Sequence, residues 1–161
     1  YTEQHIRESG MAWTFLRDSF YLDFFPGIVD EHGVMRGPAG NGRVGAVARQ
    51  DVARSAVAVL RDPSPHAERT YDMTGPEALS LTDMARIIGE AQGREVTYRE
   101  ETVKEAYASR AHYGAPAWEV DAWVSTYTAI ASGALDRVTD DVERLTGRQP
   151  LSLAQLLAGH H

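Results

Sequence analysis

The sequence predicts an α/β protein with a partial sheet followed by a helical cap. Two observations carry this prediction. Short apolar segments alternate with amphipathic helical segments up to residue 101, and almost every segment from residue 102 onward has helical periodicity. We therefore expect two parts: residues 1–101, which contain the sheet strands, and residues 102–161, which form the cap.

The first part is organised around a strand and the loop that follows it. A helix is predicted over residues 2–9, ended by Gly10, and a short buried strand over residues 12–16. Residues 17–21 then form a polar and aromatic elbow. Because α/β folds bind ligands at the carboxyl ends of their strands, this elbow is the first candidate site.

The other elements follow from periodicity, glycine and proline positions, and capping residues. Ser80 and Asp83 have the spacing of a capping box at the start of a helix. In chain order we expect a short helix or ordered loop at 20–29, a glycine-rich hairpin or loop at 33–43, a strand at 44–48, a helix at 51–60, a strand at 69–73, a helix from Ser80 to Gly93, a strand at 96–99, and helices at 102–113, 117–132, 139–145 and 153–157.

Composition argues against several classes of function. The formal net charge is −7 and the sequence contains no run of Lys or Arg, so we expect no nucleic-acid partner. No apolar run reaches the roughly 18 residues of a membrane span, so we expect no membrane partner. Cysteine is absent and the histidines lack ligand spacing, so we expect no metal site. These features fit a cytoplasmic protein.

The ends of the sequence suggest a piece of a longer chain. Residue 1 is Tyr and lies at the start of a predicted helix that has no capping residue or lead-in. At the other end, His160 and His161 are either native residues or the remnant of a tag, and the sequence leaves both possibilities open.

Several short motifs, taken in order, resemble one known family. They are Thr2-Glu3, Glu8-Ser9-Gly10, the run from Trp13 to Arg17, Phe20-Tyr21, Asp51-Val52-Ala53 at the head of a helix, the run from Tyr71 to Glu77, and the run from Thr146 to Pro150. Each motif is weak alone, but their order and spacing resemble the second half of NmrA-like atypical short-chain dehydrogenase/reductases. The resemblance covers almost the whole chain and implies part of an NAD(P)-binding Rossmann-type sheet, followed by a substrate-side helical cap.

The sequence departs from the family's pattern at one important point. The family holds the cofactor pyrophosphate with a glycine-rich loop after its first strand. The stretch from Gly37 to Gly42 is glycine-rich, but it does not lie between a first strand and its helix, and Pro38 lacks a main-chain donor. We interpret it as a hairpin loop. The resemblance therefore implies NADP or NAD in the full-length parent and no cofactor for this chain alone. The expected partner is the missing amino-terminal half or a second copy of the chain.

The resemblance also implies roles for the elbow. In the family this loop passes the nicotinamide and the substrate, so the predicted cofactor-binding residues are Arg17, Asp18, Ser19, Phe20 and Tyr21. The Arg17 guanidinium can bind an anion through two N–H groups, and the rings of Phe20 and Tyr21 can stack on a flat ligand. The alternative is that Phe20 and Tyr21 are core aromatics and that Arg17 pairs with a carboxylate such as Asp51.

Further candidates could contact the substrate, each with a structural alternative. The predicted substrate-binding residues are Tyr21, Thr74, His112, Tyr113 and Trp118. Thr74 could instead belong to a structural turn. His112 could be a general acid or base at a hinge between cap helices, or a residue favoured by the helix dipole. Asp51 could be a catalytic acid, but it fits better the N-terminal acid of its helix, and the resemblance implies a buried anchor that ties this helix to the sheet. The catalytic residue stays unassigned, since neither a nucleophile motif nor a Tyr-x-x-x-Lys pair is present.

Two functions follow from the resemblance. The first is the substrate-side half of an NAD(P)H-dependent oxidoreductase that acts on a small quinone or carbonyl compound and is inactive alone because it lacks the cofactor loop. The alternative is a non-catalytic NAD(P)-sensing regulatory protein that binds a partner protein. The family contains both kinds.

Overall fold

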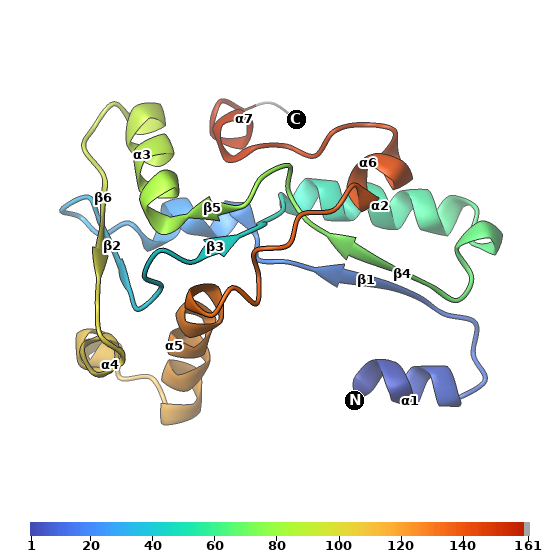
Figure 1. The fold of residues 1–161 in the computed structure, drawn as a ribbon, viewed down its shortest axis with the longest axis horizontal. Coiled ribbons are helices and arrows are strands. Elements are labelled where there is room, and N and C mark those ends of the chain that lie inside the picture. Colours follow the sequence, from blue (N-terminus) through green and yellow to red (C-terminus); the bar gives the residue numbers. More distant parts are fainter. Residues whose placement is uncertain (160–161) are drawn as a thin grey trace.

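A computed structural model describes residues 1–159 of the chain (Figure 1). His160 and His161, whose origin the sequence left open, lie outside the described residues. The α-helices are α1 (Thr2–Glu8), α2 (Arg49–Arg61), α3 (Leu81–Gln92), α4 (Val103–Arg110), α5 (Ala117–Ala131), α6 (Asp141–Thr146) and α7 (Leu153–Leu157). The strands are β1 (Thr14–Asp18), β2 (Val34–Gly37), β3 (Arg43–Val44), β4 (Arg69–Met73), β5 (Leu79–Ser80) and β6 (Thr97–Glu100). Short 3-10 helices are η1 (Leu22–Ile28), η2 (Ser64–His66) and η3 (Ala111–Tyr113).

Within residues 1–159 the strands form three two-stranded sheets. β1 pairs in parallel with β4, from Thr14 opposite Arg69 to Asp18 opposite Met73. β2 pairs in parallel with β6, whereas β3 and β5 are antiparallel. Parallel pairs with helical crossovers are typical of α/β proteins, so the predicted fold class is confirmed.

Local sequence signals fix the principal helices. α2 matches the predicted helix, and its buried side is formed by Asp51, Ser55 and Val59. α3 begins with the predicted capping box, in which the Ser80 side chain accepts from the Asp83 N–H while the Asp83 carboxylate accepts from Ser80. It ends at Gly93, whose φ of 64° lies in the left-handed region that glycine tolerates.

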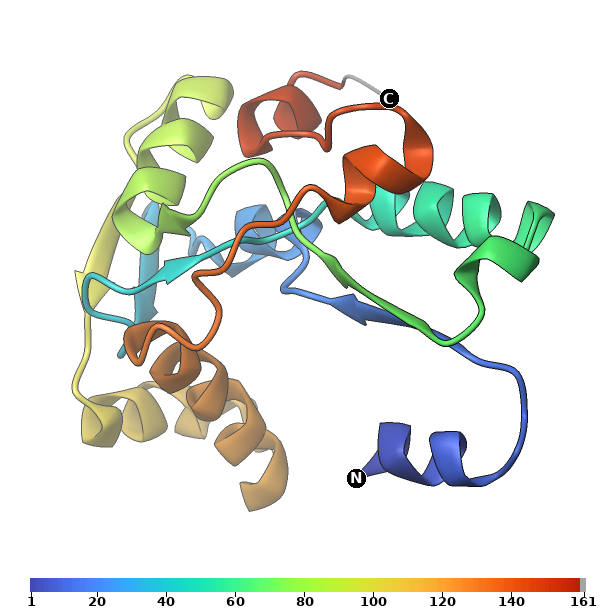
Figure 2. The same ribbon diagram turned by 45° about the vertical axis from the view of Figure 1, so that its right-hand side comes forward.

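The carboxyl-terminal helices lie in two places. α4 and α5 pack against each other beside β2 and β3, and we call this pair of helices, with η3 between them, the cap. α6 and α7 instead return to the α/β part, where α6 packs on α2 and β4, and α7 packs on α3 (Figure 2). The predicted division between residues 101 and 102 stays a prediction.

The structure corrects the predicted first strand. β1 begins and ends two residues later than expected, so Arg17 and Asp18 belong to the strand and the elbow begins at Ser19. The strand is also half-buried to exposed and not buried, because its principal packing partner in the described chain is β4 and no helix makes comparable contact with it.

Of the hairpin or loop expected at 33–43, the hairpin is wrong, and Gly37 to Gly42 is not a hairpin loop. The two strands that flank the glycine-rich turn pair with β6 and β5 and not with each other. The turn instead packs against α5: a Cβ at Gly37 would overlap the Tyr127 ring, and one at Gly42 would overlap the Ile130 carbonyl. Glycine is therefore needed here for close approach of the backbone.

None of the helices in the described residues is long and apolar enough to cross a membrane.

Candidate functional site

A cavity of about 580 Å³ lies between the elbow and the cap. We call it the aromatic cleft. Its walls come from the elbow and η1, from the start of β2, and from the α4–η3–α5 cap. The lining residues are Phe20, Phe24, Phe25, Gly27, Ile28, Val29, Asp30, Val34, Arg36, Ser109, Arg110, His112, Tyr113, Trp123, Thr126, Tyr127 and Ile130.

The wall on the elbow side is a cluster of three phenylalanines. The rings of Phe20, Phe24 and Phe25 have centroid separations between 5.7 and 6.4 Å. Two main-chain hydrogen bonds hold the elbow in place, from Val47 N–H to the Phe20 carbonyl and from Leu22 N–H to the Val47 carbonyl. This wall is therefore fixed to the α/β part.

The wall on the cap side is a second aromatic cluster. The rings of His112 and Tyr113 lie 3.9 Å apart, and Tyr113 packs edge-on against Trp123 at 5.7 Å. The His112 Nδ1 atom lies 2.8 Å from the Ser109 carbonyl oxygen, which can only accept. Nδ1 therefore carries a proton, and Nε2 is the nitrogen that can exchange a proton with a ligand.

A buried ion pair lies at the base of the cap. The Arg110 Nη1 atom lies 3.0 Å from Glu101 Oε2, and both side chains are about nine-tenths buried. Arg110 also donates to the Arg36 carbonyl oxygen, and its guanidinium lies 5.0 Å over the Tyr127 ring. Burial raises the pKa of the Tyr127 phenol, although the Arg110 cation opposes the shift, so this phenol is neutral near pH 7.

A second ion pair lies at the edge of the cleft. The Asp30 carboxylate accepts from Val34 N–H and from the Arg36 guanidinium. The Val34 N–H is the largest of the causes that lower the pKa of Asp30, and Arg36 adds to it. The guanidiniums of Arg36 and Arg110 thus each have a carboxylate partner. The balanced charge favours a neutral ligand.

The structure brings three predicted residues together in the cleft: Phe20 from the elbow, and His112 and Tyr113 from the cap. The other elbow residues are not among the described residues that line it. Arg17 makes a bidentate pair with Glu3, with both N–O distances at 2.6 Å, and Tyr21 donates to Asp18. The proposed alternative, a carboxylate partner for Arg17, is observed with Glu3 and not with Asp51.

Two substrate-binding candidates lie elsewhere. Thr74 is buried, and its hydroxyl contacts Thr139. Trp118 is 71% exposed on the outer surface of α5. The binding roles assigned to the elbow and to these residues stay predictions. Asp51 is a buried anchor, as expected, but it accepts from Leu151 N–H and so ties α2 to the carboxyl-terminal segment.

Several residues of the aromatic cleft could not be assigned to it from the sequence. Trp123 and Tyr127 lie in the helix predicted at 117–132, but apolar periodicity does not distinguish a side chain that packs in the core from one that lines a cleft. Asp30, Arg36 and Arg110 carried no signal, since their partners depend on how β2 and α4 meet.

The chain has clear relatives among proteins named as oxidoreductases and reductases. No family model matches it. It is 35% identical to Uncharacterized oxidoreductase YesF of Bacillus subtilis (strain 168), over 98% of this chain and 56% of that protein. It is 32% identical to NAD(P)H azoreductase of Xenophilus azovorans with the same coverage, and 27% identical to Quinone oxidoreductase 2 of Escherichia coli (strain K12), over 96% of this chain and 54% of that protein. The chain thus spans about half the length of the curated relatives it matches.

Solved structures of reductases superpose closely on this chain. The E. coli NADPH-dependent quinone oxidoreductase complexed with NADPH superposes with a TM-score of 0.88 and 26% identity, over 98% of this chain and 56% of that chain. Citrobacter sp. triphenylmethane reductase complexed with NADP(H) gives a TM-score of 0.85 and 27% identity, over 99% and 57%. The negative transcriptional regulator Nmra shares the fold at a TM-score of 0.69 and 15% identity, over 96% of this chain and 54% of that chain.

These comparisons confirm the predicted fold and the kind of relative. The chain has the α/β fold of NAD(P)-binding Rossmann-type reductases, and its relatives include NAD(P)H-dependent oxidoreductases. That it is the carboxyl-terminal half of such a protein stays a prediction.

Proposed function

We propose that this chain forms the substrate side of an NAD(P)H-dependent oxidoreductase that reduces a neutral, flat quinone or carbonyl compound. The named activities of the azo- and quinone-reducing relatives support the reaction class. The absence of cysteine fits the cytoplasmic location that we propose with it.

The observation that carries the proposal is the pair of aromatic walls on the cleft. Three phenylalanines from the elbow side and the His112–Tyr113–Trp123 cluster from the cap border the same 580 Å³ cavity. A volume of this size suits a small ligand, and ring faces favour a flat one. Because each cleft guanidinium is already paired with a carboxylate, a neutral ring binds without leaving a charge uncompensated.

The chain's own residues fit one end of a nicotinamide cofactor. When bound, the cofactor supplies the hydride. The elbow follows the carboxyl end of β1 and presents Phe20 to the cleft, which suits a ring. The chain fits the phosphate end of the cofactor poorly, because the Arg17 guanidinium already donates to the Glu3 carboxylate. We therefore propose that the chain alone is inactive and that another polypeptide segment supplies the phosphate-binding loop.

Tryptophan fluorescence tests ligand binding directly. We expect 1,4-naphthoquinone to quench Trp123, so Trp123→Phe removes the quenching and Trp118→Phe keeps it, because Trp118 lies outside the cleft. Tyr113→Ala should weaken binding about fivefold, since an aromatic contact contributes about 1 kcal/mol. The matched control is Tyr107→Ala on the same cap, which should bind normally. Equal effects of the two tyrosine variants would overturn the assignment of the cleft.

Turnover distinguishes the enzyme from the sensor. We expect no NADPH oxidation by the 161-residue chain alone. A hybrid in which this chain replaces the matched part of E. coli Quinone oxidoreductase 2 should oxidise NADPH with naphthoquinone. A folded hybrid that binds both compounds without turnover would contradict the oxidoreductase and favour the NAD(P)-sensing alternative.

A further inference from the structure

We propose that the Tyr127 hydroxyl donates a hydrogen bond to an acceptor oxygen of the ligand, so that the aromatic cleft selects flat rings that carry a carbonyl group. This inference rests on the proposed function and deepens it, because it names the side chain that recognises the reducible group. It concerns recognition of the ligand and not transfer of the hydride.

The ring of Tyr127 is held firmly in the wall of the cleft. It lies against the main chain of β2 at Gly37, where a Cβ atom would lie 2.3 Å from the Tyr127 Cδ1 atom. The Gly37 carbonyl is itself fixed, because it accepts from the Tyr98 hydroxyl. The Arg110 guanidinium lies 5.0 Å from the centroid of the Tyr127 ring. A ring held by two elements has little freedom left to lose when a ligand binds.

The Tyr127 hydroxyl has a proton to offer. Within residues 1–159, no protein group accepts a hydrogen bond from it. The residue is 9% exposed and lines the cavity, so the cavity gives access to it. Burial raises the pKa of this phenol against the opposing Arg110 cation, so the hydroxyl keeps its proton near pH 7. That proton is therefore available to an acceptor on the ligand.

Several other polar side chains of the cleft are already engaged. The hydroxyls of Ser109 and Thr126 donate to main-chain carbonyls of their own helices. The guanidiniums of Arg36 and Arg110 are paired with carboxylates. A ligand that approached these groups would have to break a hydrogen bond or an ion pair that the protein already makes.

The remaining polar side chains of the cleft differ from Tyr127 in exposure. His112 and Tyr113 are exposed and Trp123 is half-buried, so water competes with a ligand for their donors. The more enclosed Tyr127 hydroxyl loses water when a ring fills the cleft, and leaving it without an acceptor costs free energy. A site of this kind rejects a ring that lacks the acceptor.

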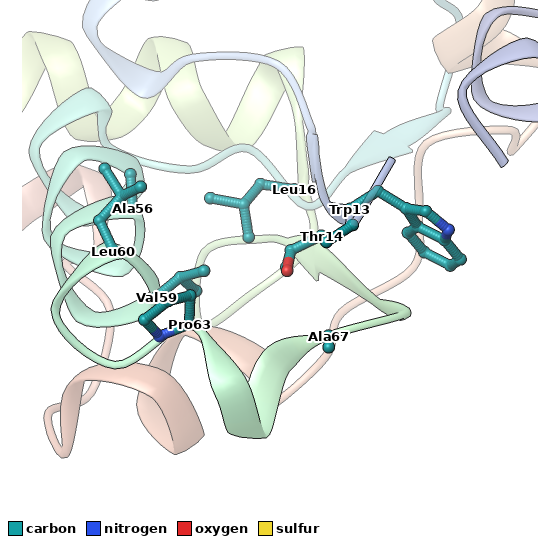
Figure 3. A pocket seen from close by; sticks show the side chains of 9 residues that line it. Trp13, Thr14, Leu16, Ala56, Val59, Leu60, Pro63 and Ala67 are labelled. Carbon is teal, nitrogen blue, oxygen red and sulfur yellow. The ribbon is translucent and has the colours of Figure 1, made fainter. Parts of the chain in front are cut away.

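A second hollow provides a contrast. It has a volume of about 340 Å³ and lies between β1 and the end of α2 (Figure 3). Its lining is apolar except for Trp13 and Thr14. The Thr14 hydroxyl donates to the His66 carbonyl, and the Trp13 ring stacks on Phe15 and points away from Leu60 in Figure 3. We therefore expect a carbonyl-bearing ring in the aromatic cleft and not in this hollow.

Infrared difference spectroscopy of the 161-residue chain tests the hydrogen bond. The probe is 1,4-naphthoquinone, whose carbonyl stretch moves to lower frequency when the oxygen accepts a hydrogen bond. We expect a shifted carbonyl band with the original chain and its loss in Tyr127→Phe, which keeps the ring and removes the hydroxyl. A merely structural role for Tyr127 would change how much ligand binds, but not the carbonyl frequency of the bound ligand.

Quenching of Trp123 fluorescence gives the matching affinities. Tyr127→Phe should weaken naphthoquinone binding about tenfold, as expected for the loss of one enclosed hydrogen bond. The matched control is Tyr113→Phe, which removes an exposed hydroxyl from the same cleft. It should change the affinity less than about twofold and keep the shifted band. Both variants retain their rings, so both should remain folded, which circular dichroism checks.

The outcomes separate this inference from the proposed function. A chain that does not bind naphthoquinone contradicts both. A chain that binds it without a shifted carbonyl band, or that keeps the band in Tyr127→Phe, contradicts only the role of Tyr127. Loss of the band in Tyr113→Phe as well would also overturn the assignment of the donor to Tyr127.

Discussion

At the residue scale, Arg110 is the side chain on which the cap depends. It pairs with buried Glu101, donates to the Arg36 carbonyl and lies over Tyr127, so one guanidinium joins α4, β2 and α5. Charged groups that are this buried are retained only when they are paired. The same contacts place Tyr127 on the cleft wall, so the stability of the cap and the shape of the cleft are coupled.

Removing this arginine should be costly. Arg110→Ala leaves the Glu101 carboxylate buried without a counter-charge, and we expect a loss of about 3–5 kcal/mol in the free energy of unfolding, measured by urea titration. The control is Arg86→Ala, which breaks an exposed pair with Glu90 and should change stability by less than about 0.5 kcal/mol. Similar small losses in both variants would contradict the role of the buried pair.

At the element scale, the capping box of α3 makes stability depend on pH. Hydrogen bonds from Ser80 lower the pKa of Asp83, and the Arg43 and Arg86 cations add to the shift. A carboxyl group whose pKa is lower in the folded state stabilises the protein above its unfolded pKa of about 3.9, and this contribution is lost as pH falls through the folded value.

The prediction is that Asp83→Asn flattens the acid limb of the stability curve. The free energy of unfolding of the original chain should fall more steeply below about pH 4 than that of the variant, because Asn does not titrate. Urea titrations between pH 2 and pH 6 measure both. Asp62→Asn, at an exposed position after α2, is the matched control and should keep the original slope. If the free energy of unfolding of Asp83→Asn fell as steeply at acid pH as that of the original chain, Asp83 would be excluded as the cause of this pH dependence.

Elements with local signals could be predicted from the sequence, but their pairing could not. Ser80, Asp83 and Gly93 define both ends of α3 through contacts that span a few residues. The strands around the glycine-rich turn were expected to form a hairpin, because a short loop between apolar segments favours local pairing. Their real partners, β5 and β6, lie more than 30 residues away, and nothing between them specifies that choice.

At the scale of the whole molecule, Asp51 joins segments that lie 100 residues apart. Its carboxylate accepts from Leu151 N–H at 2.7 Å and pairs with Arg54, and the residue is 2% exposed. The sequence predicted a structural acid here but not its partner, because no pattern near Asp51 points to residue 151. The cleft residues Arg36 and Arg110 could not be predicted for the same reason, because they come together only in the folded chain.

Loss of this anchor should loosen the carboxyl terminus. Asp51→Ala leaves the Leu151 N–H without its acceptor, and we expect a loss of about 2 kcal/mol in the free energy of unfolding, with faster exchange of the Leu151 amide. Asp51→Asn retains a carbonyl acceptor and should lose less. If both variants lose the same stability while Leu151 stays protected, the contact does not hold this segment.

Side chains from the segment before α6 and from its first residue occupy part of the outer edge of β4. The Asp72 N–H donates to the Asp141 carboxylate, and the Asp72 carbonyl accepts from the Thr139 hydroxyl. Another strand that approached this edge would find these two main-chain groups already bonded. This part of the β1–β4 sheet is thereby guarded against edge-to-edge aggregation.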